Sequence, residues 1–225
     1  MSMALKSSER EFQLLDIDGR RIEATRIKMN KKADRKLEAV ADMFCQVLPD
    51  NCEVLDGDML YRKLHINGLA PLEDVMLVYD VENRFAAISY NLLIQSVVRA
   101  NEKRYYSFEL KLDGMVRTRS MKFESACVDR QPDMREQQIL ELLNEPIVIG
   151  KIQQLGLLGV SIRYQMDYGR WLISVRSMVG SATWILMPPV MQVIMPVRQE
   201  IYQFMELMRM LTSILQGGDR DDNKT

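Results

Sequence analysis

Histidine and cysteine are scarce in this sequence, which has one histidine, His65, and three cysteines among 225 residues. A Ser-His-Asp or Cys-His catalytic system would have a single possible base, and a zinc site that needs two histidines is excluded within one chain. The Gly-x-Ser-x-Gly nucleophile motif and the glycine-rich loops of nucleotide-binding proteins do not occur. Asp56 and Asp58 supply too few oxygens for a dedicated cation site. An enzyme is therefore the least favoured class, and we predict no catalytic residue, cofactor or metal.

The cysteines lack the arrangement of a disulfide framework. Cys45, Cys52 and Cys127 are odd in number and form no Cys-x-x-Cys pair, and residues 1–10 contain no apolar segment of the signal-peptide type. These features favour a reducing cytoplasm. We expect the thiols to be small buried hydrophobes or surface groups.

Overall charge is nearly balanced, because the formal net charge is −1 with 27% charged residues. Positive charge is nevertheless concentrated in two segments, residues 20–36 and residues 103–122, and the second also holds Tyr105 and Tyr106. Basic and aromatic side chains together are typical of surfaces that bind single-stranded nucleic acid. The alternative is a solvated, ion-paired sheet face. The predicted anion-binding residues are Arg20, Arg21, Arg26, Arg104, Arg117, Arg119 and Lys122.

One long stretch without charge, from Ser177 to Val197, is the expected centre of the core. Gly180, Pro188 and Pro196 interrupt it, which argues against a membrane-spanning helix. We predict instead a buried strand at about residues 181–187, a proline-fixed turn and a helix that begins near Pro196.

The rest of the chain shows the periodicities of hairpins and helices. Hairpins are predicted at residues 12–25, 75–90, 106–120 and 160–176. The turn of the second is expected at Glu82–Asn83, the third sets Glu109 opposite Arg117, and the fourth sets Tyr164 opposite Ile173. Trp171 and Trp184 are expected on successive strands and buried in one core. Helices are predicted from Asn30 to Leu48, from Asp58 to His65, from Pro132 to Pro146 and from Val197 to Gln216, and residues 91–100 fit either a helix or a strand. Residues 147–158 form a predicted apolar linker.

These elements predict an α+β fold of mostly antiparallel β-hairpins, including a meander, with several packing helices and a long C-terminal amphipathic helix. We expect a flexible N-terminus at residues 1–10, an N-terminal α+β subdomain at 11–146, a C-terminal meander-plus-helix subdomain at 147–216 and a disordered tail at 217–225. A duplication of the Asp-Gly hairpins is an open alternative.

The C-terminal helix carries more apolar surface than one neighbour covers. It has a heptad-like seam, and we predict that it is an interaction helix, although burial between the sheet and the first helix would also cover it. The predicted interaction residues are Ile201, Phe204, Met205, Met208, Leu211 and Leu215.

The favoured function is thus a non-catalytic, cytoplasmic interaction or regulatory module that self-associates or binds a protein partner through this methionine-rich helix. The second hypothesis is an anion- or nucleic-acid-binding protein that uses the basic hairpins. The third is a peripheral membrane protein that inserts residues 184–197 into an interface. We rank a homo-oligomer or protein partner first, nucleic acid second and a membrane last.

Overall fold

The structure is a computed structural model that describes residues 30–48, 52–67, 72, 74–100, 106–113, 120–126 and 132–217. The predicted hairpin at residues 12–25 and the tail beyond Gly217 lie outside these ranges. The helices are α1 (Asn30–Val47), α2 (Met134–Leu143), α3 (Pro146–Gln154) and α4 (Arg198–Gly217). The strands are β1 (Cys52–Asp58), β2 (Tyr61–Ile66), β3 (Asp74–Arg84), β4 (Ala87–Arg99), β5 (Ser107–Asp113), β6 (Ser120–Ser125), β7 (Gly159–Gln165), β8 (Arg170–Ile185) and β9 (Val190–Val193).

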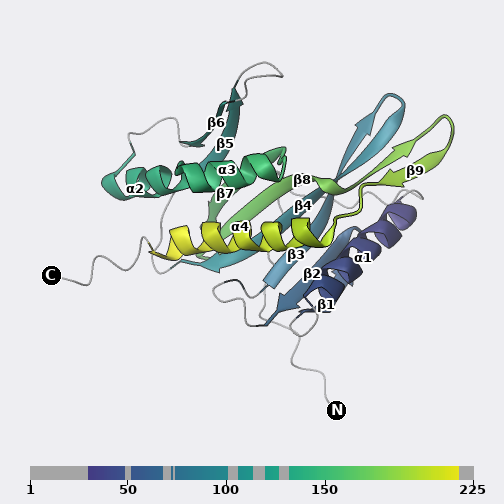
Figure 1. Ribbon diagram of the computed structural model, residues 1–225, viewed down its shortest axis with the longest axis horizontal. Helices are drawn as coiled ribbons and strands as arrows, with labels where there is room; N and C mark the ends of the chain where they lie inside the picture. The colour runs from purple at the N-terminus through teal and green to yellow at the C-terminus, as the bar shows by residue number, and fades with distance from the viewer. Residues whose placement is uncertain are drawn as a thin grey trace, which may run out of the picture.

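The described strands form one antiparallel sheet with the order β1-β2-β3-β4-β8-β7-β5-β6, and β9 pairs with β8. The helices pack against one face of this sheet (Figure 1). The predicted α+β class with a long C-terminal helix is therefore confirmed. Strand β8 lies between β4 and β7, so strands from both predicted subdomains, 11–146 and 147–216, interleave in a single sheet.

The main core lies between the sheet and the helices, because alternate residues of each strand point to the same face. Its members include Leu77, Tyr79, Leu92, Ile94, Ile173 and Val175 from the central strands. A smaller apolar cluster on the opposite face contains Met76, Val78, Leu93 and Leu172. Trp171 and Trp184 are 3% and 6% exposed, which confirms that both are buried in one core. They lie on the same strand, not on successive strands of a meander.

Helices α1, α2 and α4 follow the sequence prediction because their apolar residues recur at three- and four-residue steps. Ala33, Leu37 and Phe44 form part of the buried side of α1. At α2 the Asp133 carboxylate accepts hydrogen bonds from the backbone N–H groups of Arg135 and Glu136, the usual role of an N-cap aspartate.

Two predicted elements are wrong. The helix expected from Asp58 to His65 is instead the turn and second strand of the β1–β2 hairpin, where Leu64 and Ile66 are buried at the two-residue spacing of a strand. The linker expected at residues 147–158 is mostly helix α3. Pro146 occupies its first turn, where a proline fits, and Val148 and Ile152 are buried one turn apart.

Two predicted hairpin registers are also wrong. Glu109 of β5 pairs with Glu124 of β6 and not with Arg117, because the connection is longer than three residues. Tyr164 of β7 pairs with Trp171 of β8 and not with Ile173. This second shift is two residues, so every side chain keeps its predicted face.

A bulge in β8 interrupts its pairing with β4. Tyr90 pairs with Ala182 and Leu92 with Ser177, so Met178–Ser181 lie opposite Asn91 alone. Gly180 has φ +83°, and its carbonyl accepts a 2.6 Å hydrogen bond from the Tyr79 hydroxyl. An added Cβ at Gly180 would clash with Cδ2 of the buried Leu92 side chain. The bulge therefore requires glycine both for conformation and for space.

We predict that Gly180→Ala lowers the free energy of unfolding by about 2–4 kcal/mol, because it combines backbone strain with a clash in the core. Urea denaturation measures the loss. The matched control is Gly150→Ala in α3, where the added methyl group meets no atom within 4 Å and a gain of about 0.5–1 kcal/mol is expected. Equal stability of the two variants would contradict this account of the bulge.

Candidate binding surface at the hairpin tips

The outer parts of four strands form a blade that projects beyond the rest of the sheet (Figure 1). Strand β2 pairs with β3 only between Asp74 and Val78, and β7 pairs with β8 only between Arg170 and Arg176. Beyond these points, in the described chain, the ladder continues as β3, β4, β8 and β9 alone. We call this four-stranded extension the blade.

Two turns lie side by side at the end of the blade. Phe85 and Ala86 connect β3 to β4, and Leu186–Pro189 connect β8 to β9. The backbone N–H of Leu186 donates a 3.1 Å hydrogen bond to the carbonyl of Ala86. The two turns are therefore one structural unit, although about a hundred residues separate them in sequence.

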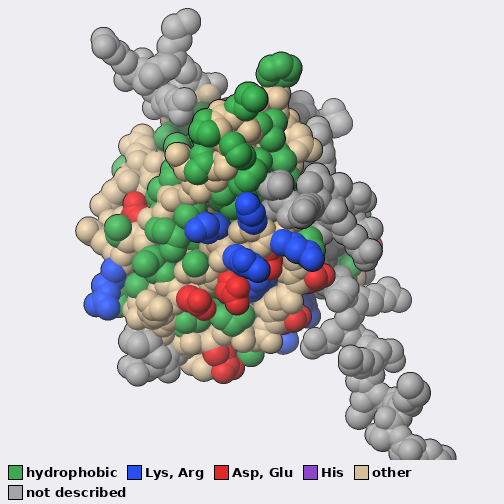
Figure 2. All heavy atoms as spheres, turned by 90° about the vertical axis from the view of Figure 1, so that its right-hand side faces the viewer, with side chains coloured by type: hydrophobic (Ala, Val, Ile, Leu, Met, Phe, Trp, Pro, Cys, Tyr) green, Lys and Arg blue, Asp and Glu red, His purple; other side chains and the backbone are tan. Residues whose placement is uncertain are grey.

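The end of the blade is apolar and exposed. Phe85 is 104% exposed and Met187 is 90% exposed, and Pro188 and Pro189 beside them are also exposed. We define the tip patch as the exposed apolar side chains Phe85, Leu186, Met187 and Val190. Figure 2, which faces this end of the molecule, shows apolar side chains gathered over the upper part of the surface. Exposed apolar patches of this kind are where interaction sites are sought on a protein surface.

Basic side chains of α1 lie next to the blade. We define the basic turns as Lys31, Lys32, Arg35 and Lys36, in the first two turns of the helix. The Lys32 ammonium lies 4.8 Å from the centroid of the Trp184 ring on β8, which fixes the basic turns beside the blade. Figure 2 shows Lys and Arg side chains in a band below the apolar patch. Asp34 is the one acidic residue in the same two helical turns, and it forms an ion pair with Arg62.

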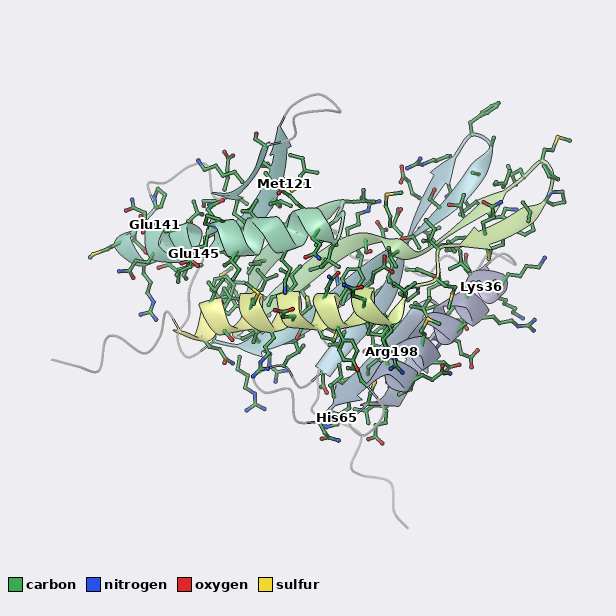
Figure 3. All side chains as sticks on the ribbon, in the orientation of Figure 1. Lys36, His65, Met121, Glu141, Glu145 and Arg198 are labelled. Carbon is green, nitrogen blue, oxygen red and sulfur yellow. The ribbon has the colours of Figure 1, made fainter. Side chains whose placement is uncertain are left out.

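Most of the anion-binding residues predicted from the sequence lie outside the part of the chain that the structure describes, so this assignment stays a prediction. Arg20, Arg21, Arg26, Arg104, Arg117 and Arg119 lie outside the described residues. Lys122 is exposed on β6, at the opposite end of the strand order from β1 and β2, which α1 covers. Figure 3 shows this separation, with Lys36 on α1 and Met121, the neighbour of Lys122, on distant parts of the molecule. In the described part of the chain, the basic turns lie beside the blade, and Arg84 lies on the blade itself, where it is ion-paired with Glu82.

The predicted interaction helix faces inward. Ile201, Phe204, Met205, Met208, Leu211 and Leu215 are all buried, at most 4% exposed. Helix α4 packs against α1, α2, α3 and strands β4 and β8, so these neighbours together cover the apolar surface that one neighbour could not. The surface on which the self-association hypothesis rested is thus part of the core, and self-association itself stays a prediction. No helix in the described part of the chain combines the length and apolarity that crossing a membrane requires.

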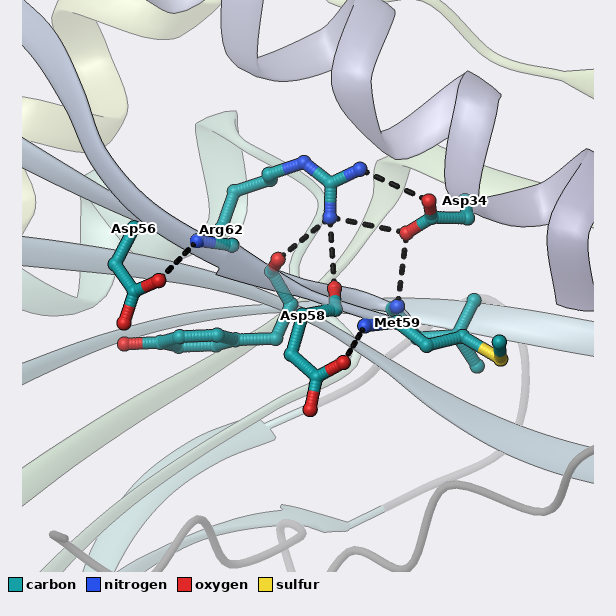
Figure 4. Close-up of polar contacts among 8 residues, drawn as sticks. Asp34, Asp56, Asp58, Met59 and Arg62 are labelled. Atoms are coloured by element: carbon teal, nitrogen blue, oxygen red, sulfur yellow. Dashed lines mark hydrogen bonds and ion pairs between the residues drawn. The ribbon is translucent and has the colours of Figure 1, made fainter.

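The polar groups near β1 are occupied by structural contacts. Arg62 forms a two-pronged ion pair with Asp34, with both N···O distances 3.0 Å, and also donates to the backbone carbonyls of Tyr61 and Asp58 (Figure 4). Asp56 and Asp58 lie at the end of strand β1, and the turn expected at Asp56–Asp58 is instead at Met59 and Leu60. The carboxylates of Asp56 and Asp58 each accept a hydrogen bond from the following backbone N–H. These residues line a shallow hollow, and their polar groups are already engaged in the hydrogen bonds and the ion pair described above.

His65 is likewise a structural residue. Its Nδ1 lies 2.8 Å from Asp74 Oδ1 and its Nε2 lies 3.0 Å from Asn67 Oδ1. The hydrogen bond with Asp74 raises the pKa of His65 above its ordinary value, because it stabilises the charged imidazolium. With both nitrogens engaged by oxygen acceptors, His65 is poorly suited to act as a general base.

Sequence reasoning identified one side of the tip patch and missed the other. Residues 184–197, which include Met187, were the inserting segment of the third and last-ranked binding hypothesis, which stays a prediction. Phe85 was predicted to lie in a strand, because the turn was expected at Glu82–Asn83. In the structure Glu82 and Asn83 pair with Ser89 and Ile88, which moves the turn to Phe85 and Ala86.

Comparison with known proteins places the chain in a family but supplies no function. A family model described as protein of unknown function (DUF3156) matches residues 46–215. No curated protein and no solved structure matches. The matched segment includes both turns of the tip patch, whereas the basic turns of α1 precede it.

We predict that Met205→Glu unfolds the chain or lowers the free energy of unfolding by about 3 kcal/mol or more, because it places a carboxylate in the core. The matched control is Gln199→Glu, which adds the same carboxylate on the exposed side of α4 and is expected to change stability by less than about 0.5 kcal/mol. Urea denaturation with size-exclusion light scattering measures stability and mass. A stable Met205→Glu variant that only loses self-association would show that α4 is an external interaction helix.

Proposed function

We propose that this chain, which belongs to the DUF3156 family of proteins of unknown function, is a non-catalytic module that binds reversibly to an anionic lipid surface. In this proposal the tip patch enters the interfacial layer of the lipid, and the basic turns of α1 contact the headgroups. The observation that carries the proposal is the nearly complete exposure of Phe85 and Met187 on two turns that a backbone hydrogen bond joins.

The shape of the surface supports a lipid partner. The tip patch lies on the projecting end of a blade, so it fits into a yielding apolar layer without a matching pocket. Phe85 and Met187 have large apolar side chains, and no charged residue occurs from Phe85 to Val98 or from Ser177 to Val197. Arg84, which precedes Phe85, is ion-paired with Glu82 and largely exposed. Insertion limited to the two turns therefore removes apolar surface from water while this ion pair stays at the headgroup level.

The charge of the neighbouring helix supports an anionic lipid in particular. Each basic residue near an anionic leaflet contributes about 1 kcal/mol, and full burial of a Phe or Met side chain contributes about 1.5–3 kcal/mol. The basic turns supply four such charges beside two such side chains. The free-energy cost of association offsets much of this gain. The net binding free energy is therefore that of a reversible surface contact and not of a permanent anchor.

The apolar half of the proposal is tested by sedimentation with phosphatidylcholine vesicles that contain phosphatidylserine. The double variant Phe85→Ser, Met187→Ser is expected to bind at least about tenfold more weakly, because it removes the inserting side chains. The matched control is Met166→Ser. Met166 is also an exposed methionine in a turn between two strands, β7 and β8, and is 60% exposed. Its replacement is expected to leave binding unchanged.

The electrostatic half is tested with the same vesicles. Lys31→Gln, Lys36→Gln should weaken binding about tenfold, and raised salt should weaken it further. The matched control, Lys111→Gln, Lys122→Gln, removes the same charge from the β5–β6 hairpin. Equal binding to vesicles with and without phosphatidylserine, or wild-type binding by the Phe85→Ser, Met187→Ser variant, would overturn the proposal.

A further inference from the structure

Cys45 on α1 and Cys52 at the start of β1 lie against each other, with their sulfur atoms 2.7 Å apart. This is closer than the roughly 3.5–4.0 Å at which non-bonded carbon atoms pack. Neither thiol is bridged in the structure, and both are half-buried at the edge of the core, within reach of a small reagent. The pair therefore has the proximity and the access that thiol–disulfide exchange needs.

We infer that Cys45 and Cys52 form a reversible disulfide that fastens the last turns of α1 to strand β1. The two residues are seven positions apart, so the bond closes a short loop at the edge of the sheet. The first half of α1 is already held to the β1–β2 hairpin by the Asp34–Arg62 ion pair. Oxidation would thus attach both halves of helix α1 to this hairpin. The inference does not depend on lipid binding.

The reaction requires a two-electron oxidant, for which we name a low-molecular-weight disulfide such as oxidised glutathione. The Cys45 thiolate, after losing its proton to solvent, attacks one sulfur of the reagent and releases one glutathione thiolate. The Cys52 sulfur, losing its proton in turn, attacks the Cys45 sulfur of the mixed disulfide and releases the second glutathione. Two cysteine thiols are oxidised to one disulfide, and one reagent disulfide is reduced to two thiols.

The environment of the pair favours Cys45 as the attacking group. Burial raises the pKa of both thiols above the ordinary value, and the hydrogen bond between them opposes this rise at Cys45 but adds to it at Cys52. Because the thiolate is the attacking species, oxidation should accelerate about tenfold per pH unit while the pH stays below the pKa of Cys45.

The test uses the full chain, treated with oxidised glutathione at mildly alkaline pH, alkylated and digested with a protease that cleaves before aspartate. Cleavage at Asp50 separates Cys45 from Cys52 in the sequence, so mass spectrometry of the peptides distinguishes a cross-link from two adducts. We expect a Cys45–Cys52 cross-link that dithiothreitol reverses, with Cys127 alkylated. The melting temperature of the oxidised chain should rise by several degrees.

Single-cysteine substitutions show which sulfur atom attacks the reagent and which closes the disulfide. Cys52→Ser should accumulate a glutathione adduct on Cys45, because the resolving thiol is missing, and Cys127→Ser should form the cross-link as the wild type does. Separate glutathione adducts on Cys45 and Cys52 in the wild type, a cross-link that includes Cys127, or full alkylation of all three thiols after oxidation would overturn the inference.

Discussion

The pairing of β4 with β8 is the contact on which the rest of the fold depends. It joins residues about 70 to 100 positions apart at the centre of the sheet, whereas most of the other pairings are hairpins with local connections. Closing so long a loop has an entropic cost that the packed core must offset. The bulge at Gly180 lets the ladder continue beyond Leu92, and the Tyr79 and Ser181 hydroxyls bond to backbone groups around it. Without this bulge the outer strands would not stay in register.

The tip patch is a direct result of that long-range pairing. The β3–β4 turn alone would present one large exposed apolar side chain, Phe85, and the β8–β9 turn would present Leu186 and Met187. Small exposed groups of this size are ordinary for a surface. The ladder from Ala87–Ile185 outward places Phe85 and Met187 at one end of a rigid extension, and the packing of Lys32 on Trp184 places positive charge beside it. The proposed lipid contact therefore uses two distant segments that the fold, and not the local sequence, brings together.

The sequence predicts helices α1, α2 and α4 and the facing of most strands, because three- to four-residue and two-residue periodicities report local geometry. It fails where the choice depends on distant partners. The β1–β2 hairpin has too few apolar residues to be distinguished from a helix. The side chain of Tyr164 points to the same face of the sheet whether Tyr164 pairs with Trp171 or with Ile173, so the alternation of residues does not choose between the two registers. The apolar surface of α4 pointed to an external partner, yet the neighbours that cover it come from the whole chain. The exposure of Phe85 likewise depends on distant partners. Met187 lies in the charge-free stretch that the sequence singles out, whereas Phe85 lies in a segment that the sequence assigns to a strand.

The depth to which the tip enters the lipid tests the central claim most directly. Phe85→Trp and Met166→Trp variants, bound to phosphatidylserine-containing vesicles whose acyl chains carry bromine, would report contact through quenching of the added tryptophan. Trp171 and Trp184 are buried and give a common background. The account predicts strong quenching at position 85 and none at position 166. Equal quenching at the two positions, or binding without quenching at position 85, would contradict it.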